Sequence, residues 1–352
     1  MDDYLFPPLT KQHVLNCAFA IWYPIFRRVT IKSEIIPIPA DFLDYLHQDG
    51  VFLPLDSNGM PQPSYETPKD EYDTESESES ENENNNDNEW GKIPDFPEFQ
   101  ETIAAKIDSL GGSVFPKLNW SSPKDACWMA LGQTMQCKTA ADIFLLLKSS
   151  DFIAHDLTCP FEACVAEIVE GHEDISKKSA DSYDLILRKW YELHPSMEFR
   201  CFVKDGVLVG ICQRDYLNHY PFLVSSRLTL ESAITNFFKN EINGKFLNAS
   251  YVFDVYMNKN NQRVWLLDFN PFSIITDSLL FEWNEILQHE GTEGMGLRVV
   301  LSNGETGLQH QPMYATNRIP KDAIDLSDGK TLAEFAQKMV EEMALAQASP
   351  PQ

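Results

Sequence analysis

The stretch from Tyr251 to Phe272 constrains this chain most, because it places acids where a β-hairpin normally carries apolar residues. Both arms are rich in β-branched and aromatic residues, and the polar run 258–262 between them has the composition of a turn. If the loop is centred on Asn261, Asp254 on one arm lies directly opposite Asp268 on the other. The stretch therefore predicts two antiparallel strands with two facing carboxylates.

Like charges opposed across two strands destabilise a sheet unless a cation lies between them. Strict alternation places Asp268 and Asn270 together on the face of Val264 and Leu266. Mg²⁺ prefers carboxylate and amide oxygens, together with the oxygens of a bound phosphate. We therefore predict a metal site formed by Asp254, Asp268 and Asn270. The alternatives are an exposed hairpin face without a metal and a register that separates the acids.

The acidic composition narrows the class of partner. The 352 residues carry a net charge of −25, and residues 66–89 alone contain eleven acids and one lysine. Contacts to nucleic-acid phosphates require patches of Lys and Arg, so direct nucleic-acid binding is not expected. A partner with a basic surface is favoured instead.

The cysteines and the hydropathy pattern indicate the compartment. The seven cysteines form no Cys-x-x-Cys pair, and we identify no histidine at the spacing of zinc ligands beside them. They are expected to be reduced thiols. We find neither a signal sequence nor an apolar run of membrane-spanning length. A cytoplasmic protein without a membrane anchor is expected.

Two further segments carry charge in predicted strands. Lys117 ends a short strand and precedes a loop, where a lysine either reaches a phosphate as a point charge or is simply solvated. The dipeptide Asp205-Gly206 lies between alternating arms and predicts a second hairpin. On one face of that hairpin, Glu198 and Arg200 form either a structural ion pair or part of an anion site.

Five motifs, taken in order, resemble the cell division cycle protein 123 family. The resemblance runs from near residue 5 to about residue 300 and rests on Trp22-Tyr-Pro-Ile-Phe, Phe115-Pro-Lys-Leu-Asn-Trp-Ser, Leu187-Arg-Lys-Trp, Met197-Glu-Phe-Arg-Cys-Phe-Val and Leu267-Asp-Phe-Asn-Pro-Phe. It implies an α+β, ATP-grasp-like fold in which two lobes with antiparallel sheets hold ATP and Mg²⁺ between them.

The expected organisation combines these two lobes with polar additions. Residues 56–92 are rich in Pro, Ser, Asn and Glu without periodicity, which predicts a disordered acidic insertion. The complete expected order is 1–55, the N-terminal part of the first lobe; 56–92, the insertion; 93–187, the remainder of the first lobe; 188–310, the second lobe with the metal site; and 311–352, a C-terminal extension with a terminal helix.

The resemblance also implies residue roles. Contacts to the nucleotide are expected from the phosphate-binding lysine and its loop, from the backbone of the strand between the lobes beside adenine, and from an arginine facing the phosphates: Lys117, Trp120, Arg188, Lys189, Trp190 and Arg200. The metal is expected on Asp254, Asp268 and Asn270. No catalytic residue is assigned.

The implied function is that of an ATP-binding assembly chaperone for eukaryotic translation initiation factor 2. Such a protein binds the γ subunit of that factor and supports translation initiation and cell-cycle progression, and a monomer is expected. The alternative is an ATP-grasp ligase or kinase acting on an unidentified acceptor. The motifs lack a neighbouring Ser-His or Cys-His pair, which favours a binding protein over an enzyme.

Overall fold

The computed structural model describes residues 6–48, 53, 95–130, 132–165, 180, 182–258, 263–291 and 294–302. All of them belong to one compact unit, Met1–Thr306. The acidic insertion predicted for 56–92 and the extension predicted for 311–352 lie outside these residues. Among the described helices, none is long and apolar enough to cross a membrane.

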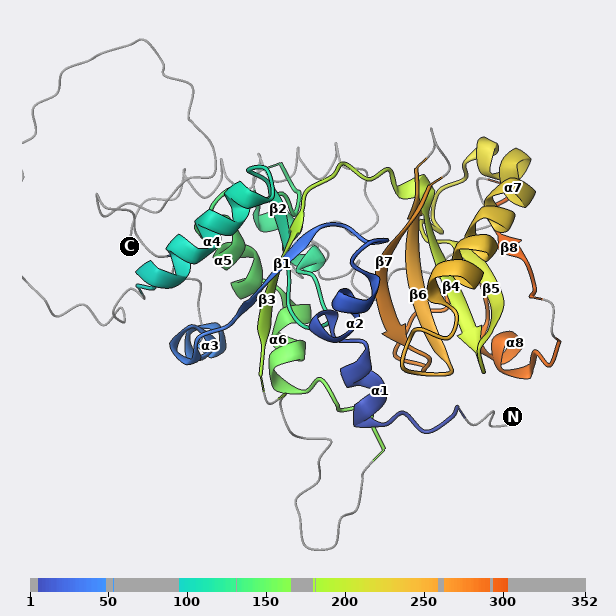
Figure 1. Ribbon diagram of the computed structural model, residues 1–352, viewed down its shortest axis with the longest axis horizontal. Helices are drawn as coiled ribbons and strands as arrows, with labels where there is room; N and C mark the ends of the chain where they lie inside the picture. The colour runs from blue at the N-terminus through green and yellow to red at the C-terminus, as the bar shows by residue number, and fades with distance from the viewer. Residues whose placement is uncertain are drawn as a thin grey trace, which may run out of the picture. The chain divides into compact units, whose positions relative to one another are not determined.

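One antiparallel sheet is built from three strands that are far apart in the sequence (Figure 1). Its order is β1-β3-β2, with β1 at Ser33–Pro37, β3 at Asp184–Lys189 and β2 at Val114–Lys117. The central strand β3 has a continuous apolar run that is fully buried. Its core is shared with four helices: α3 (Ala40–His47), α4 (Pro97–Ser109), α5 (Ala140–Lys148) and α6 (Asp151–Thr158).

The second sheet has five strands in the order β7-β6-β4-β5-β8 (Figure 1). Neighbouring strands are antiparallel, except that β5 and β8 are parallel. Two helices, α2 (Phe19–Phe26) and α7 (Pro221–Phe237), share a hydrophobic cluster with one face of this sheet. The strands are β4 (Glu198–Lys204), β5 (Val207–Gln213), β6 (Tyr251–Met257), β7 (Val264–Pro271) and β8 (Leu297–Arg298).

The α+β prediction is confirmed by these two sheets and their helices. The N-terminal segment packs with the second sheet, because Trp22 and Phe26 of α2 lie in the same cluster as strands β4, β6 and β7. Residue 188, the predicted start of the second lobe, lies inside β3. The remaining elements are α1 (Lys11–Asn16), α8 (Trp283–Gln288), the 3-10 helices η1 (Lys124–Met129) and η3 (Pro195–Met197), and the π-helix η4 (Phe238–Ile242).

The hairpin predicted at Asp205-Gly206 is confirmed, and it connects β4 to β5. Asp205 has a φ of 50° and Gly206 a φ of 78°. Two-residue turns with positive φ at both positions match the twist of the flanking strands, and Asp-Gly adopts that conformation readily. This hairpin places Arg200 beside β6.

The hairpin of β6 and β7 has the predicted pairing but not the predicted alternation. Asp254 is opposite Asp268, and Val255 is opposite Leu266, so Leu267 is an extra residue in a β-bulge. Strict alternation had placed Asp268 on the face of Leu266, and this prediction is wrong. The bulge reverses the faces after Leu267, so that Phe269 joins Leu266 in the core. Asp268 and Asn270 therefore lie on the same face as Asp254.

Candidate functional site

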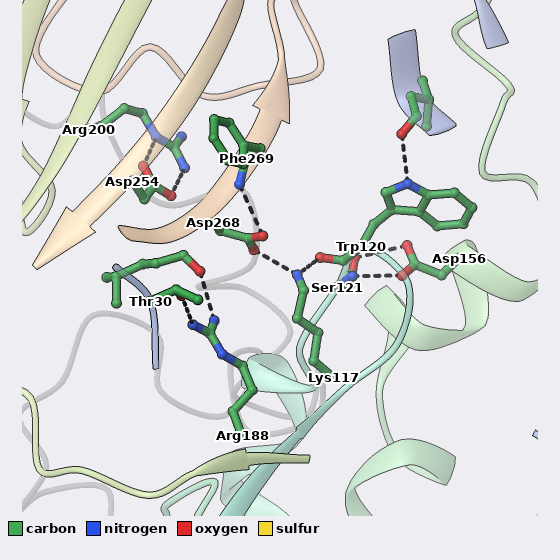
Figure 2. Close-up of polar contacts among 12 residues, drawn as sticks. Thr30, Lys117, Trp120, Ser121, Asp156, Arg188, Arg200, Asp254, Asp268 and Phe269 are labelled. Atoms are coloured by element: carbon green, nitrogen blue, oxygen red, sulfur yellow. Dashed lines mark hydrogen bonds and ion pairs between the residues drawn. The ribbon is translucent and has the colours of Figure 1, made fainter. Parts of the chain in front are cut away.

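The side chain of Lys117 connects the two sheets (Figure 2). It extends from the last residue of β2 and is 1% exposed, and its Nζ lies 2.7 Å from Oδ2 of Asp268 on β7. The ammonium also donates a hydrogen bond to the carbonyl oxygen of Trp120. In this structure the buried charge of Lys117 is therefore compensated by a carboxylate from the other sheet.

Asp254 is compensated by two arginines. Its Oδ1 and Oδ2 accept hydrogen bonds of 2.8 and 2.9 Å from Arg200, and Nε of Arg214 lies 3.3 Å from Oδ2. Burial raises the pKa of Asp254, but the two guanidinium groups outweigh it and hold the pKa well below its ordinary value. Each of the two opposed acids thus has its own cationic partner, which relieves their repulsion.

Glu198 and Arg200 do not pair with each other. Oε2 of Glu198 lies 2.6 Å from Nη1 of Arg214, with which it forms an ion pair. Arg200 is instead paired with Asp254 on the neighbouring strand. Arg200 is also fixed by a hydrogen bond to the carbonyl oxygen of Asp277. Glu198 and Arg200 thus belong to one network that leads to the hairpin acids, and Arg214 is a member that sequence analysis did not identify.

Arg188 is buried between aromatic rings. Its Nη1 donates to the carbonyl oxygen of Leu267 at 2.8 Å, and its Nη2 donates to Oγ1 of Thr30 at 3.3 Å (Figure 2). The guanidinium carbon lies 5.2 and 5.3 Å from the ring centres of Phe19 and Phe115. Burial lowers the pKa of Arg188 to about 10. This side chain joins β3 to the bulge of β7, and the described structure leaves its Nε without a partner.

The backbone donors of Lys189 and Trp190 are used inside the first sheet. Lys189 N–H donates to the carbonyl oxygen of Lys32 at 2.9 Å, and Trp190 N–H donates to Ser113 at 3.0 Å. Contact between adenine and the backbone of this strand stays a prediction. The residues that follow directly, 191–193, line a cavity instead.

That cavity has a volume of about 390 Å³, which is within the range of small-molecule sites. One wall is the connection 191–193 between the sheets, and the opposite wall is formed by Tyr256, Trp265 and Leu267 of the β6–β7 hairpin. Leu267, which lines the cavity, directly precedes Asp268 of the charged cluster on β7. Aromatic and aliphatic side chains line the cavity together with Lys32 and Glu192, a mixture that suits a ligand with an aromatic group and polar substituents.

The loop after β2 is anchored at several points. Trp120 Nε1 donates to the carbonyl oxygen of Val14, and Ser121 donates through its N–H and its hydroxyl to Asp156 at 2.8 and 2.9 Å (Figure 2). Asp125 accepts hydrogen bonds from the first backbone N–H groups of α6. Burial raises the pKa of Asp156 to about 6, against the hydrogen bonds from Ser121. The loop is thus held rigidly on both sides of residue 124.

Lys124 is a candidate that sequence analysis missed. Its side chain is solvent exposed, yet charged groups surround it. The positive charge of Arg214 and then desolvation lower the pKa of Lys124 to about 8, while Glu198, Asp254 and Asp268 oppose this shift. A second lysine seven residues after Lys117 was the available sequence signal. Its ammonium is close enough to the hairpin acids for Asp254 and Asp268 to act on its pKa.

The donor set fits a hard divalent cation at two of the three predicted residues. Asp268 is 24% exposed, and its oxygens accept from Lys117 and from the N–H of Phe269. Asn270 is half-buried on the same face and adds a neutral amide oxygen. Asp254 is 3% exposed and committed to Arg200 through both oxygens. A metal would therefore reach Asp268 and Asn270 more readily than Asp254, because they are less buried.

Comparison with known proteins gives concordant similarities. The family model described as D123 matches residues 22–327. The chain is 41% identical over 349 residues to a translation initiation factor eIF2 assembly protein of Xenopus tropicalis, covering 96% of this chain and 97% of that protein. For the protein of the same description from Danio rerio, the identity is 42% over 351 residues, covering 96% and 94%.

A solved structure is similar as well. C-terminally truncated Cdc123 from Schizosaccharomyces pombe superposes with a TM-score of 0.64 at 35% identity, covering 84% of this chain and 100% of that chain. The arrangement of the two sheets described above is therefore shared with a protein whose structure has been determined.

Proposed function

The chain belongs to the D123 family, and on that premise we propose that it is an ATP- and Mg²⁺-binding assembly factor for eIF2 that acts through the γ subunit. Support comes from relatives described as eIF2 assembly proteins, which align with 96% of the chain. A relative from Aspergillus terreus is described as cell division cycle protein 123, which agrees with a role in cell-cycle progression. We propose a cytoplasmic monomer.

The observation that carries the proposal is the ion pair between Lys117 and Asp268. Each of these residues has chemistry suited to one part of an ATP–Mg²⁺ complex: an ammonium for phosphate and a carboxylate for the metal. Without ligand, the two charges compensate each other across the sheets. With ligand, each would exchange its partner for the complementary part of the complex. Charge is balanced in both states, so neither state leaves a buried charge uncompensated.

The surrounding residues divide the proposed ligand into parts. Asp268 and Asn270 would hold Mg²⁺, which would neutralise the charge of the phosphates. Asp254, which is paired with Arg200, would lie next to this metal site opposite Asp268. Lys117 and Lys124 would contact phosphate oxygens from the anchored loop. The adenine would enter the 390 Å³ cavity beside Leu267. In this ATP-grasp-like arrangement, the ligand touches both sheets.

Binding at both sheets explains how a nucleotide would serve assembly. A ligand that contacts both sheets increases the fraction of molecules in which the two have one fixed arrangement. A partner that recognises this arrangement then binds with a higher apparent affinity. The net charge of −25 favours a partner with a basic surface and accelerates their encounter at low salt.

The test begins with calorimetric titration of the full chain with ATP, with and without MgCl₂, followed by capture of the eIF2 γ subunit under the same conditions. We expect tight ATP binding only with Mg²⁺ and stronger capture when both are present. Failure to bind the γ subunit under every condition rejects the assembly role. Phosphate release that depends on a second substrate favours the ligase or kinase alternative instead.

A further inference from the structure

Three metal-ligating side chains meet at the end of α6, on a part of the chain that the proposed nucleotide site does not use. A ring nitrogen of His155, the Sγ of Cys159 and a carboxylate oxygen of Glu162 all lie within 4.8 Å of one another. His155 and Glu162 are exposed, and Cys159 is half-buried. We call these three residues the α6 cluster.

The sequence expectation that no histidine stands at zinc-ligand spacing beside a cysteine is wrong for this cluster. His155 and Cys159 are four residues apart, and α6 with its C-terminal cap places them on the same face. A separation of four residues brings two side chains together only when the segment is helical, and the sequence did not predict a helix at residues 151–158. Glu162 is added by the turn that follows, which sequence spacing alone does not specify.

We propose that the α6 cluster is a binding site for one zinc ion. A thiolate and an imidazole select a borderline-soft metal such as Zn²⁺ over Mg²⁺, which requires oxygen ligands. Zinc accepts Cys, His and Glu together, at ligand distances of ~2.0–2.3 Å. The three atoms, which now lie within 4.8 Å of one another, would need to approach to less than ~4 Å, and the exposed side chains of His155 and Glu162 can rotate toward Cys159. Three protein ligands leave the fourth position to water.

The surroundings of the cluster favour a cation. The ligands lie at the C-terminal end of α6, where the backbone carbonyl groups give a partial negative charge. Thr158 Oγ1 lies 3.5 Å from Cys159 Sγ, while its hydroxyl donates to the carbonyl oxygen of Ala154 at 2.8 Å.

The turn that carries Glu162 is also fixed in place. Glu162 N–H donates to the carbonyl oxygen of Cys159 at 3.1 Å, and Phe161 between them is fully buried. Phe161 packs against the ring of Trp120. The third ligand is therefore held close to the helix end before any metal binds.

A zinc ion at this site would stabilise the end of α6, which contacts the loop that follows β2. Asp156, which lies between the two helical ligands, accepts both hydrogen bonds from Ser121. A zinc ion bound at the end of α6 would therefore stiffen the helical turn on which this loop rests. This role is independent of whether the chain binds ATP.

The test uses the full-length, reduced and metal-free protein. Zinc is titrated in competition with a chromophoric chelator, with excess MgCl₂ present to occupy oxygen-only sites. We expect one zinc per chain and a rise in melting temperature. Cys159→Ser and His155→Ala should each weaken binding at least tenfold, and Glu162→Gln by a smaller factor. Matched controls at two other half-buried cysteines, Cys127→Ser and Cys164→Ser, should leave the affinity unchanged.

A second measurement needs no variant. Zinc should protect Cys159, but not Cys127, from alkylation in the wild-type chain, as measured by mass spectrometry of the labelled peptides. Unprotected Cys159 at saturating zinc would overturn the proposal. So would the absence of a zinc site in the wild-type protein, or an unchanged affinity in the double variant of His155 and Cys159.

Discussion

Two ion pairs hold the two acids of one hairpin, and they differ in what they connect. Arg200 and Asp254 join neighbouring strands of the five-stranded sheet. Lys117 and Asp268 join that sheet to the three-stranded one. The side chain of Asp254 is 3% exposed and receives two arginines, whereas that of Asp268 is 24% exposed and receives one lysine.

This difference separates a structural contact from an exchangeable one. Asp254 cannot leave Arg200 without removing the carboxylate that compensates a buried guanidinium, which is costly. Asp268 can release Lys117 whenever a phosphate takes its place. We infer that Asp254 stabilises the fold, whereas Asp268 can exchange its partner for a ligand. Substitutions at charged residues of this region and of the loop beside it test that distinction.

Asp254→Ala should destabilise the fold by about 3–5 kcal/mol, because it leaves the buried charge of Arg200 without a carboxylate. Urea denaturation measures this loss. Because the pKa of Asp254 is lowered in the folded state, its contribution is complete above ~pH 4 and is lost as the pH falls further. The control Glu198→Ala removes a more exposed pair with Arg214 and should cost less than ~1 kcal/mol. Equal losses would contradict the distinction.

Asp156 is a buried acid for comparison with Asp254, because within the described part of the chain no arginine or lysine is bonded to it. Its pKa is raised to about 6, so the folded state takes up a proton that the unfolded chain does not bind between about pH 6 and 4. The free energy of unfolding from this group therefore rises as the pH falls through that range, by up to ~3 kcal/mol. Asp156→Asn should remove this component. Denaturation of both proteins at pH 4.5 and 7.5 checks it, and an identical pH dependence would refute the assignment.

Asp268→Ala should destabilise the fold somewhat less than Asp254→Ala, by about 2–3 kcal/mol, because it leaves the buried ammonium of Lys117 with the carbonyl oxygen of Trp120, at a position that is partly open to water. Its main effect should be on the proposed ligand, with ATP–Mg²⁺ affinity reduced at least ~10-fold, or about 1.4 kcal/mol. Asp268→Asn keeps the shape and the acceptor for Phe269 N–H but loses the charge. Calorimetric titration that shows wild-type affinity in both variants would remove Asp268 from the metal site.

Lys124→Met should leave the chain folded, because the residue lies at the surface and replacing its ammonium also removes the repulsion from Arg214. ATP affinity should nevertheless fall about tenfold. A phosphate beside Lys124 would also raise its pKa from about 8, so binding near pH 8 should take up protons in the wild type and not in the variant. Calorimetry in two buffers of different ionisation enthalpy measures this uptake. Lys138→Met, at another exposed lysine, serves as the control and should behave as the wild type.

The sequence by itself determined the features that depend on neighbouring residues. Alternating apolar residues and the Asp205-Gly206 turn predicted both hairpins, because strand periodicity and turn conformation are local properties. The pairing of Asp254 with Asp268 followed from the same pattern. Lys117 was correctly placed at the end of a strand. The α+β class followed from the resemblance of the five motifs to a known family, and the structure confirms it.

Only the tertiary structure decided which charges meet and which face they share. Lys117 and Asp268 are 151 residues apart, and their contact depends on how the two sheets pack. The bulge at Leu267 reverses the faces of β7, because this places Phe269 in the core. A rule of strict alternation cannot predict this bulge, because the rule does not include the free energy gained when Phe269 is buried. The α6 cluster likewise required a helix and the turn beyond it. Local patterns thus specify the strands, while long-range packing specifies the site.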